Sequence, residues 1–119
     1  MIKFKSLNQN KQFLSVLKKK KIHTKYFTIY FKKNLGKKTN KYLNISFVTK
    51  KKIGNSVIRN KIKRKLKAAV QKTSINKHLI DLNYTYIIFG KNNVYKDKFS
   101  LILKDVSDTF KKLNKMENK

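Results

Sequence analysis

The acidic residues of this chain are confined to its last third, and this asymmetry limits both its fold and its partners. Residues 1–80 contain 24 of the 32 Lys and Arg residues and none of the five Asp and Glu residues. The net charge of +27 is carried by only 119 residues, so like-charge repulsion opposes the compact state unless a polyanion compensates it. Nucleic acid is the polyanion that such a charge predicts.

The remaining composition indicates one folded domain over residues 1–119. Hydrophobic residues make up 39% of the chain and include eight Phe and six Tyr, enough for a modest core. No stretch approaches the roughly 18 apolar residues of a membrane span, and the first residues lack the apolar region of a secretory signal. There is no Cys, which excludes disulfides and thiolate metal sites. We therefore expect a cytoplasmic protein without membrane contact.

Hydrophobic periodicity predicts an α/β (α+β) domain. The pattern gives six elements in the order α-β-β-α-β-α, over residues 8–19, 25–33, 42–49, 56–72, 84–89 and 98–113. The short connection between the first two strands predicts an antiparallel hairpin, while the helix between the second and third predicts a parallel pair. The residues after about 113 are expected to fray.

Two elements have faces that bear on function. Alternation in the first strand separates Phe27, Ile29 and Phe31 from Tyr26, Thr28 and Tyr30. One set must be core, and the other could form a stacking platform for single-stranded nucleic acid. The helix over 56–72 has an apolar stripe and an opposite polar face. The stripe comprises Ile58, Ile62, Leu66, Ala69 and Val70, and the polar face comprises Asn60, Arg64, Lys67 and Gln71.

The pattern of titratable residues argues against catalysis by this chain. Asp105 and Asp108 are spaced as two surface acids of one helix, and His23 and His78 have no acid or Cys beside them. General acid–base catalysis and metal binding need such groups to converge. We therefore expect no catalytic residue and no metal-binding residue in the protein itself.

The segment from Lys50 to Arg64 has the features of a phosphate-binding surface. The only two Arg residues, Arg59 and Arg64, fall within six residues of each other, and the guanidinium fork pairs with phosphate better than an ammonium does. Gly54 permits a positive φ or a close approach to phosphate. The helix that follows has free amides at its N-terminus, which attract anions.

This segment also carries a specific family resemblance. Lys51 to Arg64 follows the pattern K-K-x-G-N-(A/S)-V-x-R-N-(K/R)-x-K-R, which resembles the signature of the bacterial ribonuclease P protein component. The similarity extends to the predicted strands and to Phe13 in the first helix. It implies a two-layer α/β sandwich with a mixed sheet and a left-handed β-α-β crossover, whereas general handedness rules favour the right hand.

The resemblance also implies a function. The family binds a large catalytic RNA and the 5′ leader of precursor tRNA, and it assists endonucleolytic removal of that leader. The chain would thus be an enzyme only as part of a ribonucleoprotein, with the chemistry in the RNA subunit. The implied cofactor is Mg²⁺ held through the RNA, with none bound by the protein alone. The implied stoichiometry is one protein per RNA.

The resemblance assigns residues to both partners by matching position. Contacts to the RNA subunit are expected from a basic and polar set: Lys51, Lys52, Asn55, Arg59, Asn60, Lys61, Lys63, Arg64 and Lys67. A cleft for the leader is expected to be lined by Phe13, Leu17 and Tyr30.

A second function remains compatible with the composition. Small basic ribosomal proteins and ribosome-assembly factors have similar size and charge. The RNA that co-purifies would separate the two interpretations: a structured non-ribosomal RNA favours ribonuclease P, and ribosomal RNA favours the alternative.

Overall fold

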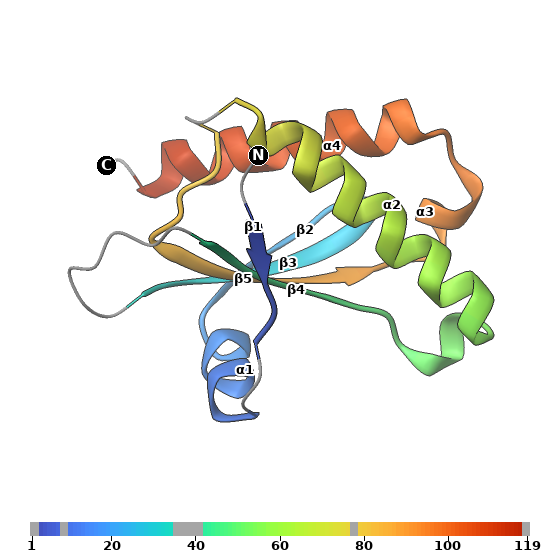
Figure 1. Cartoon of the computed structure of the whole chain (residues 1–119), viewed down its shortest axis with the longest axis horizontal. Coiled ribbons are helices and arrows are strands. Elements are labelled where there is room, and N and C mark those ends of the chain that lie inside the picture. Colours follow the sequence, from blue (N-terminus) through green and yellow to red (C-terminus); the bar gives the residue numbers. More distant parts are fainter. Residues whose placement is uncertain (1–2, 8–9, 35–41, 77–78, 118–119) are drawn as a thin grey trace.

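The computed structural model describes residues 3–7, 10–34, 42–76 and 79–117, which form one five-stranded mixed sheet with helices on both faces (Figure 1). The elements are β1 (Lys3–Lys5), α1 (Asn10–Leu17), β2 (Lys20–His23), β3 (Phe27–Lys33), β4 (Tyr42–Val48), a 3₁₀ turn η1 (Lys51–Ile53), α2 (Ser56–Ser74), β5 (Tyr84–Gly90), α3 (Asn93–Lys96) and α4 (Phe99–Glu117). Most of the turn expected over 34–41, and His78, lie outside the described residues.

The sheet order β1-β4-β5-β3-β2 shows that the predicted hairpin is wrong. Strands β3 and β4 do not pair, because β5 lies between them, antiparallel to β3 and parallel to β4. Nearly every residue of β5 is buried, as expected for a central strand covered on both faces. The eight residues between Lys33 and Tyr42 are long enough to cross the roughly 10 Å between strands two positions apart.

The parallel pairing of β4 with β5 through α2 confirms the predicted crossover. In Figure 1, β4 and β5 run in the same direction, α2 returns above them, and the path moves from β4 to the more distant β5. This path is left-handed, as the resemblance implied. The crossover places the start of α2 at the carboxyl ends of both strands.

The main core lies between the sheet and the layer of α2 and α4, above the sheet in Figure 1. On β3 the side chains of Phe27, Ile29 and Phe31 are buried there, which decides which face of this strand is core. The predicted stripe of α2 is also buried from Ile62 to Val70. Helix α1 covers part of the opposite face, where Val16 and Ile87 are buried outside the main core.

Gly90 allows α2 to lie close to the end of β5. A Cβ atom at this position would come within 2.5 Å of Ile62 Cγ2 and 2.9 Å of Leu66 Cδ1. Both side chains are fully buried and have no free space to move into. The absent side chain at residue 90 therefore sets the distance between the helix and the central strand.

Three short elements and one helix end were not predicted. The edge strands β1 and β2 and the helix α3 have only three or four residues, too few for a periodic signal. Lysines at 20 and 21, expected to end the first helix, belong to β2, where an edge position leaves them solvated. Helix α4 continues to Glu117, beyond the predicted end at about residue 113. Among the described residues, no helix is both long and apolar enough to span a membrane.

Tyr26 differs from the sequence prediction, because it does not share an exposed face with Tyr30. Its ring is 5% exposed, and its hydroxyl donates a 2.5 Å hydrogen bond to the carboxylate of Asp97. This hydrogen bond lowers the pKa of Asp97, as does the Lys25 ammonium 3.5 Å away, although burial opposes both. The same bond raises the pKa of Tyr26 to about 12, so the phenol remains a donor. The contact ties the start of β3 to the α3–α4 connection.

Replacing Tyr26 with Phe is expected to give a pH-dependent loss of stability. The folded state favours ionised Asp97, so the stabilisation is present above the ordinary Asp pKa of about 3.9. It is lost as the pH falls through the lower pKa of the folded state. Denaturant unfolding of the wild type and Tyr26→Phe should therefore differ most near neutral pH, and the difference should shrink in acid. A difference independent of pH would contradict this account, and Tyr42→Phe, at an exposed tyrosine, is the control.

Candidate nucleic-acid interface

The start of α2 is fixed by a short loop that carries the basic motif. The turn η1 ends at Gly54, which has a φ of 158°, so the first of the two roles expected for this glycine, a positive φ, is observed. Asn55 then caps α2, because its Oδ1 accepts a hydrogen bond from the backbone N–H of Ile58 at 3.0 Å. This structural role was missed by the sequence interpretation, which assigned Asn55 only to RNA contact, although Asn is a favoured N-cap residue.

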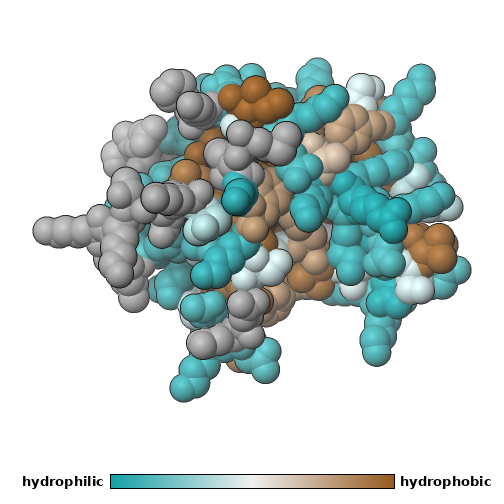
Figure 2. Space-filling model, viewed as in Figure 1, coloured by the Kyte–Doolittle hydropathy of each residue, from teal (hydrophilic) through white to brown (hydrophobic). Residues whose placement is uncertain are grey.

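The motif presents its cations on the outer side of the loop and helix. Exposed members are Lys51, Lys52, Asn55, Asn60, Lys61, Arg64 and Lys67, while Arg59 and Lys63 are half-buried. Figure 2 shows hydrophilic side chains over much of this view of the molecule, with hydrophobic residues in small separate patches. The structure therefore brings the nine expected RNA-contacting residues onto one loop and one helix.

Arg59 has an unusual polar atom. Its Nε is buried and has no hydrogen-bond partner among the described residues. A buried donor without a partner costs free energy comparable to a lost hydrogen bond. An acceptor supplied by a bound molecule would remove that cost.

Lys65 lies on the same helix but is engaged within the protein. Its ammonium donates to the carbonyls of Val94, Tyr95 and Asp97 at 3.0, 3.2 and 3.1 Å. A cation is favoured at these carbonyls, at the end of α3. Some basic residues of α2 are therefore exposed to solvent, whereas Lys65 is bound within the protein and holds the α3–α4 connection against the helix.

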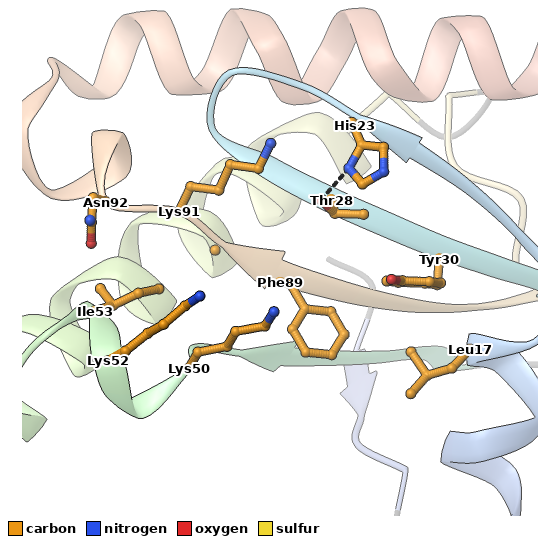
Figure 3. Close-up of a pocket in the computed structure, with 11 residues that line it drawn as sticks. Leu17, His23, Thr28, Tyr30, Lys50, Lys52, Ile53, Phe89, Lys91 and Asn92 are labelled. Atoms are coloured by element: carbon orange, nitrogen blue, oxygen red, sulfur yellow. Dashed lines mark hydrogen bonds between the residues drawn. The ribbon is translucent and has the colours of Figure 1, made fainter.

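A cavity of about 440 Å³ lies at the carboxyl ends of β4 and β5, beside the motif loop. It is lined by Leu17, His23, Thr28, Tyr30, Lys50, Lys52, Ile53, Phe89, Gly90, Lys91 and Asn92 (Figure 3). Two of the three residues expected in the cleft, Leu17 and Tyr30, are among them. The third, Phe13, is not among the lining residues, but its ring packs edge-on against Phe89 with ring centroids 6.4 Å apart.

Aromatic rings form the middle of this cavity, with cations on one side. Tyr30 packs edge-on against Phe89 at 5.6 Å. Figure 3 shows Lys50 and Lys52 rising from the motif loop on one side of the Phe89 ring, with Leu17 and Tyr30 on the other. This arrangement offers faces for stacking bases and ammonium groups for their phosphates.

The polar residues of the cavity continue to the sheet edge through the register of β2 with β3. His23 pairs with Thr28 and Lys21 with Tyr30, so each pair shares a face. The His23 ring Nδ1 lies 2.8 Å from the Thr28 hydroxyl, and the Lys21 ammonium lies 5.8 Å from the Tyr30 ring centroid. The cavity floor therefore extends across β5 and β3 onto the edge strand β2.

Several lining residues were missed by the sequence interpretation. His23 has no acid or Cys beside it in the sequence, and Lys91 belongs to no motif. In the structure, the Lys91 ammonium donates a hydrogen bond to the Thr24 carbonyl at 2.6 Å. Phe89 is the last residue of the predicted third strand. Side chains alternate between the two faces of a strand, so the neighbouring Ile88, which is buried, could have indicated that Phe89 faces the opposite side of the sheet. No group of three or more His, Cys, Asp or Glu side chains gathers in the described part of the chain.

The chain matches a known protein family. A family model described as Ribonuclease P matches residues 1–114, nearly the whole chain. The chain belongs to the ribonuclease P family. This match favours the ribonuclease P function over the alternative of a ribosomal protein or ribosome-assembly factor.

Curated relatives of this ribonuclease P chain cover most of its length. The ribonuclease P protein component of Carboxydothermus hydrogenoformans is 30% identical over 107 residues, covering 89% of this chain and 88% of that protein. The component of Mesoplasma florum is 29% identical over 104 residues, covering 87% and 89%.

Solved ribonuclease P proteins share the fold. The protein of Thermotoga maritima superposes with a TM-score of 0.72 at 22% identity, covering 91% of this chain and 96% of that one. The Staphylococcus aureus protein has a TM-score of 0.61 at 24% identity, covering 89% and 92%. The α/β sandwich implied by the sequence resemblance is therefore confirmed. The chain is a protein component of the tRNA-processing ribonucleoprotein endoribonuclease that gives the family its name.

Substitutions of Asn55 should separate helix capping from RNA binding in this ribonuclease P protein. Asn55→Ala removes the acceptor and is expected to destabilise the fold by about 1 kcal/mol. Asn55→Asp keeps an acceptor, and its charge suits the helix N-terminus, so stability should be retained. The added carboxylate should nevertheless weaken RNA binding by repelling phosphate.

The measurements are thermal unfolding and RNA affinity at fixed salt. Asn83→Asp makes the same charge change at the opposite end of the sheet, just before β5, and should leave RNA affinity nearly unchanged. Equal losses of affinity for the two Asp variants would mean that only net charge matters.

Proposed function

We propose that this protein binds the ribonuclease P RNA subunit through the outer surface of the motif loop and α2, and the 5′ leader of precursor tRNA in the cavity. The observation that carries the proposal is the continuity of the two surfaces. Lys52 belongs to the motif and also lines the aromatic cavity. One protein per RNA would then hold the leader at a fixed place relative to the RNA subunit.

The outer surface of α2 suits a folded RNA. A convex helix face with spaced ammonium and guanidinium groups matches the regular phosphates of an RNA backbone. The unpartnered Nε of Arg59 supports the same assignment, because a phosphate or carbonyl oxygen of the RNA would satisfy it. Asn60 adds a donor and an acceptor for a ribose hydroxyl or a base edge.

The cavity suits a single strand. Its volume lies in the range of sites for small ligands, and its exposed aromatic surface is useful only to bases that are not paired. Lys50 and Lys52 line the same cavity, so their ammonium groups would neutralise phosphates between the stacked bases. The leader is the single-stranded part of the precursor, so it is the occupant that we assign.

We assign the cleavage chemistry to the RNA subunit, with Mg²⁺ held through the RNA and no cofactor held by the protein alone. The five acids of the chain all follow residue 80, and only Asp105 and Asp108 lie close together in the sequence. Mg²⁺ sites in proteins use carboxylates that converge on the ion. What this chain's own residues do in the reaction is bind and orient the leader.

Cleavage assays with separated components test this assignment. Protein freed of RNA should not cleave precursor tRNA at any Mg²⁺ concentration, whereas adding the RNA subunit should give cleavage at the 5′ end of the mature tRNA. Cleavage by RNA-free protein, abolished by a chelator, would place the chemistry in this chain instead.

Replacing Tyr30 with Ala tests the leader cavity. Loss of a base stack should weaken binding of precursor tRNA to the assembled complex by about 1–3 kcal/mol. Binding of mature tRNA, which lacks the leader, should not change. Stability should fall slightly, because the ring packs on Phe89 and such a pair contributes about 0.5–1.5 kcal/mol.

The matched control is Phe4→Ala. Phe4 is also half-buried and stacks on Phe47 at 6.3 Å, but it lies on an edge strand outside the cavity. Phe4→Ala should lower stability by a similar amount. It should not change the affinity for precursor tRNA relative to that for mature tRNA. Equal losses for precursor and mature tRNA in Tyr30→Ala would contradict the leader assignment.

A further inference from the structure

An exposed aromatic ring lies beside the motif helix, outside both surfaces described so far. Tyr95 belongs to α3, and 39% of its surface is exposed. The ammonium of Lys61 lies 5.6 Å from the centroid of its ring. Tyr95 does not line the cavity. The ring thus extends the cationic surface of α2 with an aromatic group.

The ring is held in a fixed position by two internal contacts. Val94, the preceding residue, is fully buried in the main core. The ammonium of Lys65 donates hydrogen bonds to the carbonyls of Val94, Tyr95 and Asp97. A side chain displayed on an anchored backbone loses little conformational entropy when it binds a partner, which favours affinity.

The charge around Tyr95 favours a polyanion. Lys96 and Lys98 are exposed on the same segment. The acid between them, Asp97, uses its carboxylate to bind Tyr26 and Lys25. A partner that approaches Tyr95 therefore meets cations and an aromatic ring, a combination that suits a nucleotide with an accessible base.

We propose that Tyr95 stacks on an unpaired base of the RNA subunit whose phosphate is bound by Lys61, with Lys65 as the positioning residue. The inference rests on the proposed function, in which Lys61 contacts the RNA subunit. A phosphate bound by Lys61 lies within one nucleotide of the Tyr95 ring, because the ammonium and the ring are already in contact. The contact would add a base to the interface, whereas phosphate contacts alone position the RNA without contacting its bases.

The test measures the affinity of the full-length protein for the isolated RNA subunit at fixed salt. Tyr95→Ala should weaken binding by about 5- to 150-fold, the range that one base–aromatic stack provides. Tyr95→Phe should bind like the wild type, because stacking needs the ring and not the hydroxyl. Tyr42→Ala is the matched control: Tyr42 is 47% exposed and begins β4 at the opposite end of the sheet, so its removal should not change the affinity.

A double-mutant cycle tests whether the two side chains meet the same nucleotide. If Lys61 and Tyr95 bind one nucleotide, the combined loss in Lys61→Ala with Tyr95→Ala should be clearly smaller than the sum of the single losses. Thermal unfolding of each variant accounts for changes in folding. Fully additive losses would overturn the shared contact.

Three other outcomes overturn the inference. Tyr95→Ala could bind the RNA subunit as well as Tyr42→Ala does. Tyr95→Phe could lose as much affinity as Tyr95→Ala, which would indicate a hydrogen bond by the hydroxyl. Tyr95→Ala could weaken only leader-bearing tRNA, which would assign the ring to the substrate. Failure of the wild-type protein to bind the RNA subunit would instead reject the proposed function itself.

Discussion

The close contact between α2 and the end of β5 determines where the motif surface lies relative to the central strand. With no side chain at Gly90, Ile62 and Leu66 can pack directly over the central strand. That packing directs the polar face of α2 outward, and the parallel arrangement of β4 and β5 puts the motif loop at the mouth of the cavity. A larger residue at position 90 would force buried side chains or the helix to move, and both surfaces would move with it.

The basic residues that look alike in the sequence divide into three groups in the structure. Lys61, Arg64 and their exposed neighbours remain available to a polyanion, whereas Lys65 and Lys91 use their ammonium groups on main-chain carbonyls. Lys50 and Lys52 border the aromatic cavity. The net charge provides attraction at long range, but the positions of a few cations next to aromatic rings define the specific contacts.

The sequence predicted the elements that have strong local patterns and missed those decided by distant contacts. The stripe from Ile62 to Val70 was sufficient to place the core face of α2. The alternation in β3 left two candidate faces, and the structure shows that Phe27, Ile29 and Phe31 are core. The hairpin was wrong because the local rule for short connections cannot foresee that β5 inserts between its neighbours. The internal role of Lys65 was equally hidden, since the carbonyls that it binds lie about 30 residues away in the chain.

The central position of β5 has a consequence for the order in which the chain can fold. Until residues 84–90 have left the ribosome, β3 and β4 lack their shared neighbour β5, which is the central strand of the sheet. The first 80 residues of the part already synthesised carry 24 cations and not one acid. Because non-local pairing must wait for its partner strand, the sheet closes only after about three quarters of the chain exists. The nascent segment is therefore a charged, unpaired polymer beside the RNA-rich ribosome, and folding ends that exposure.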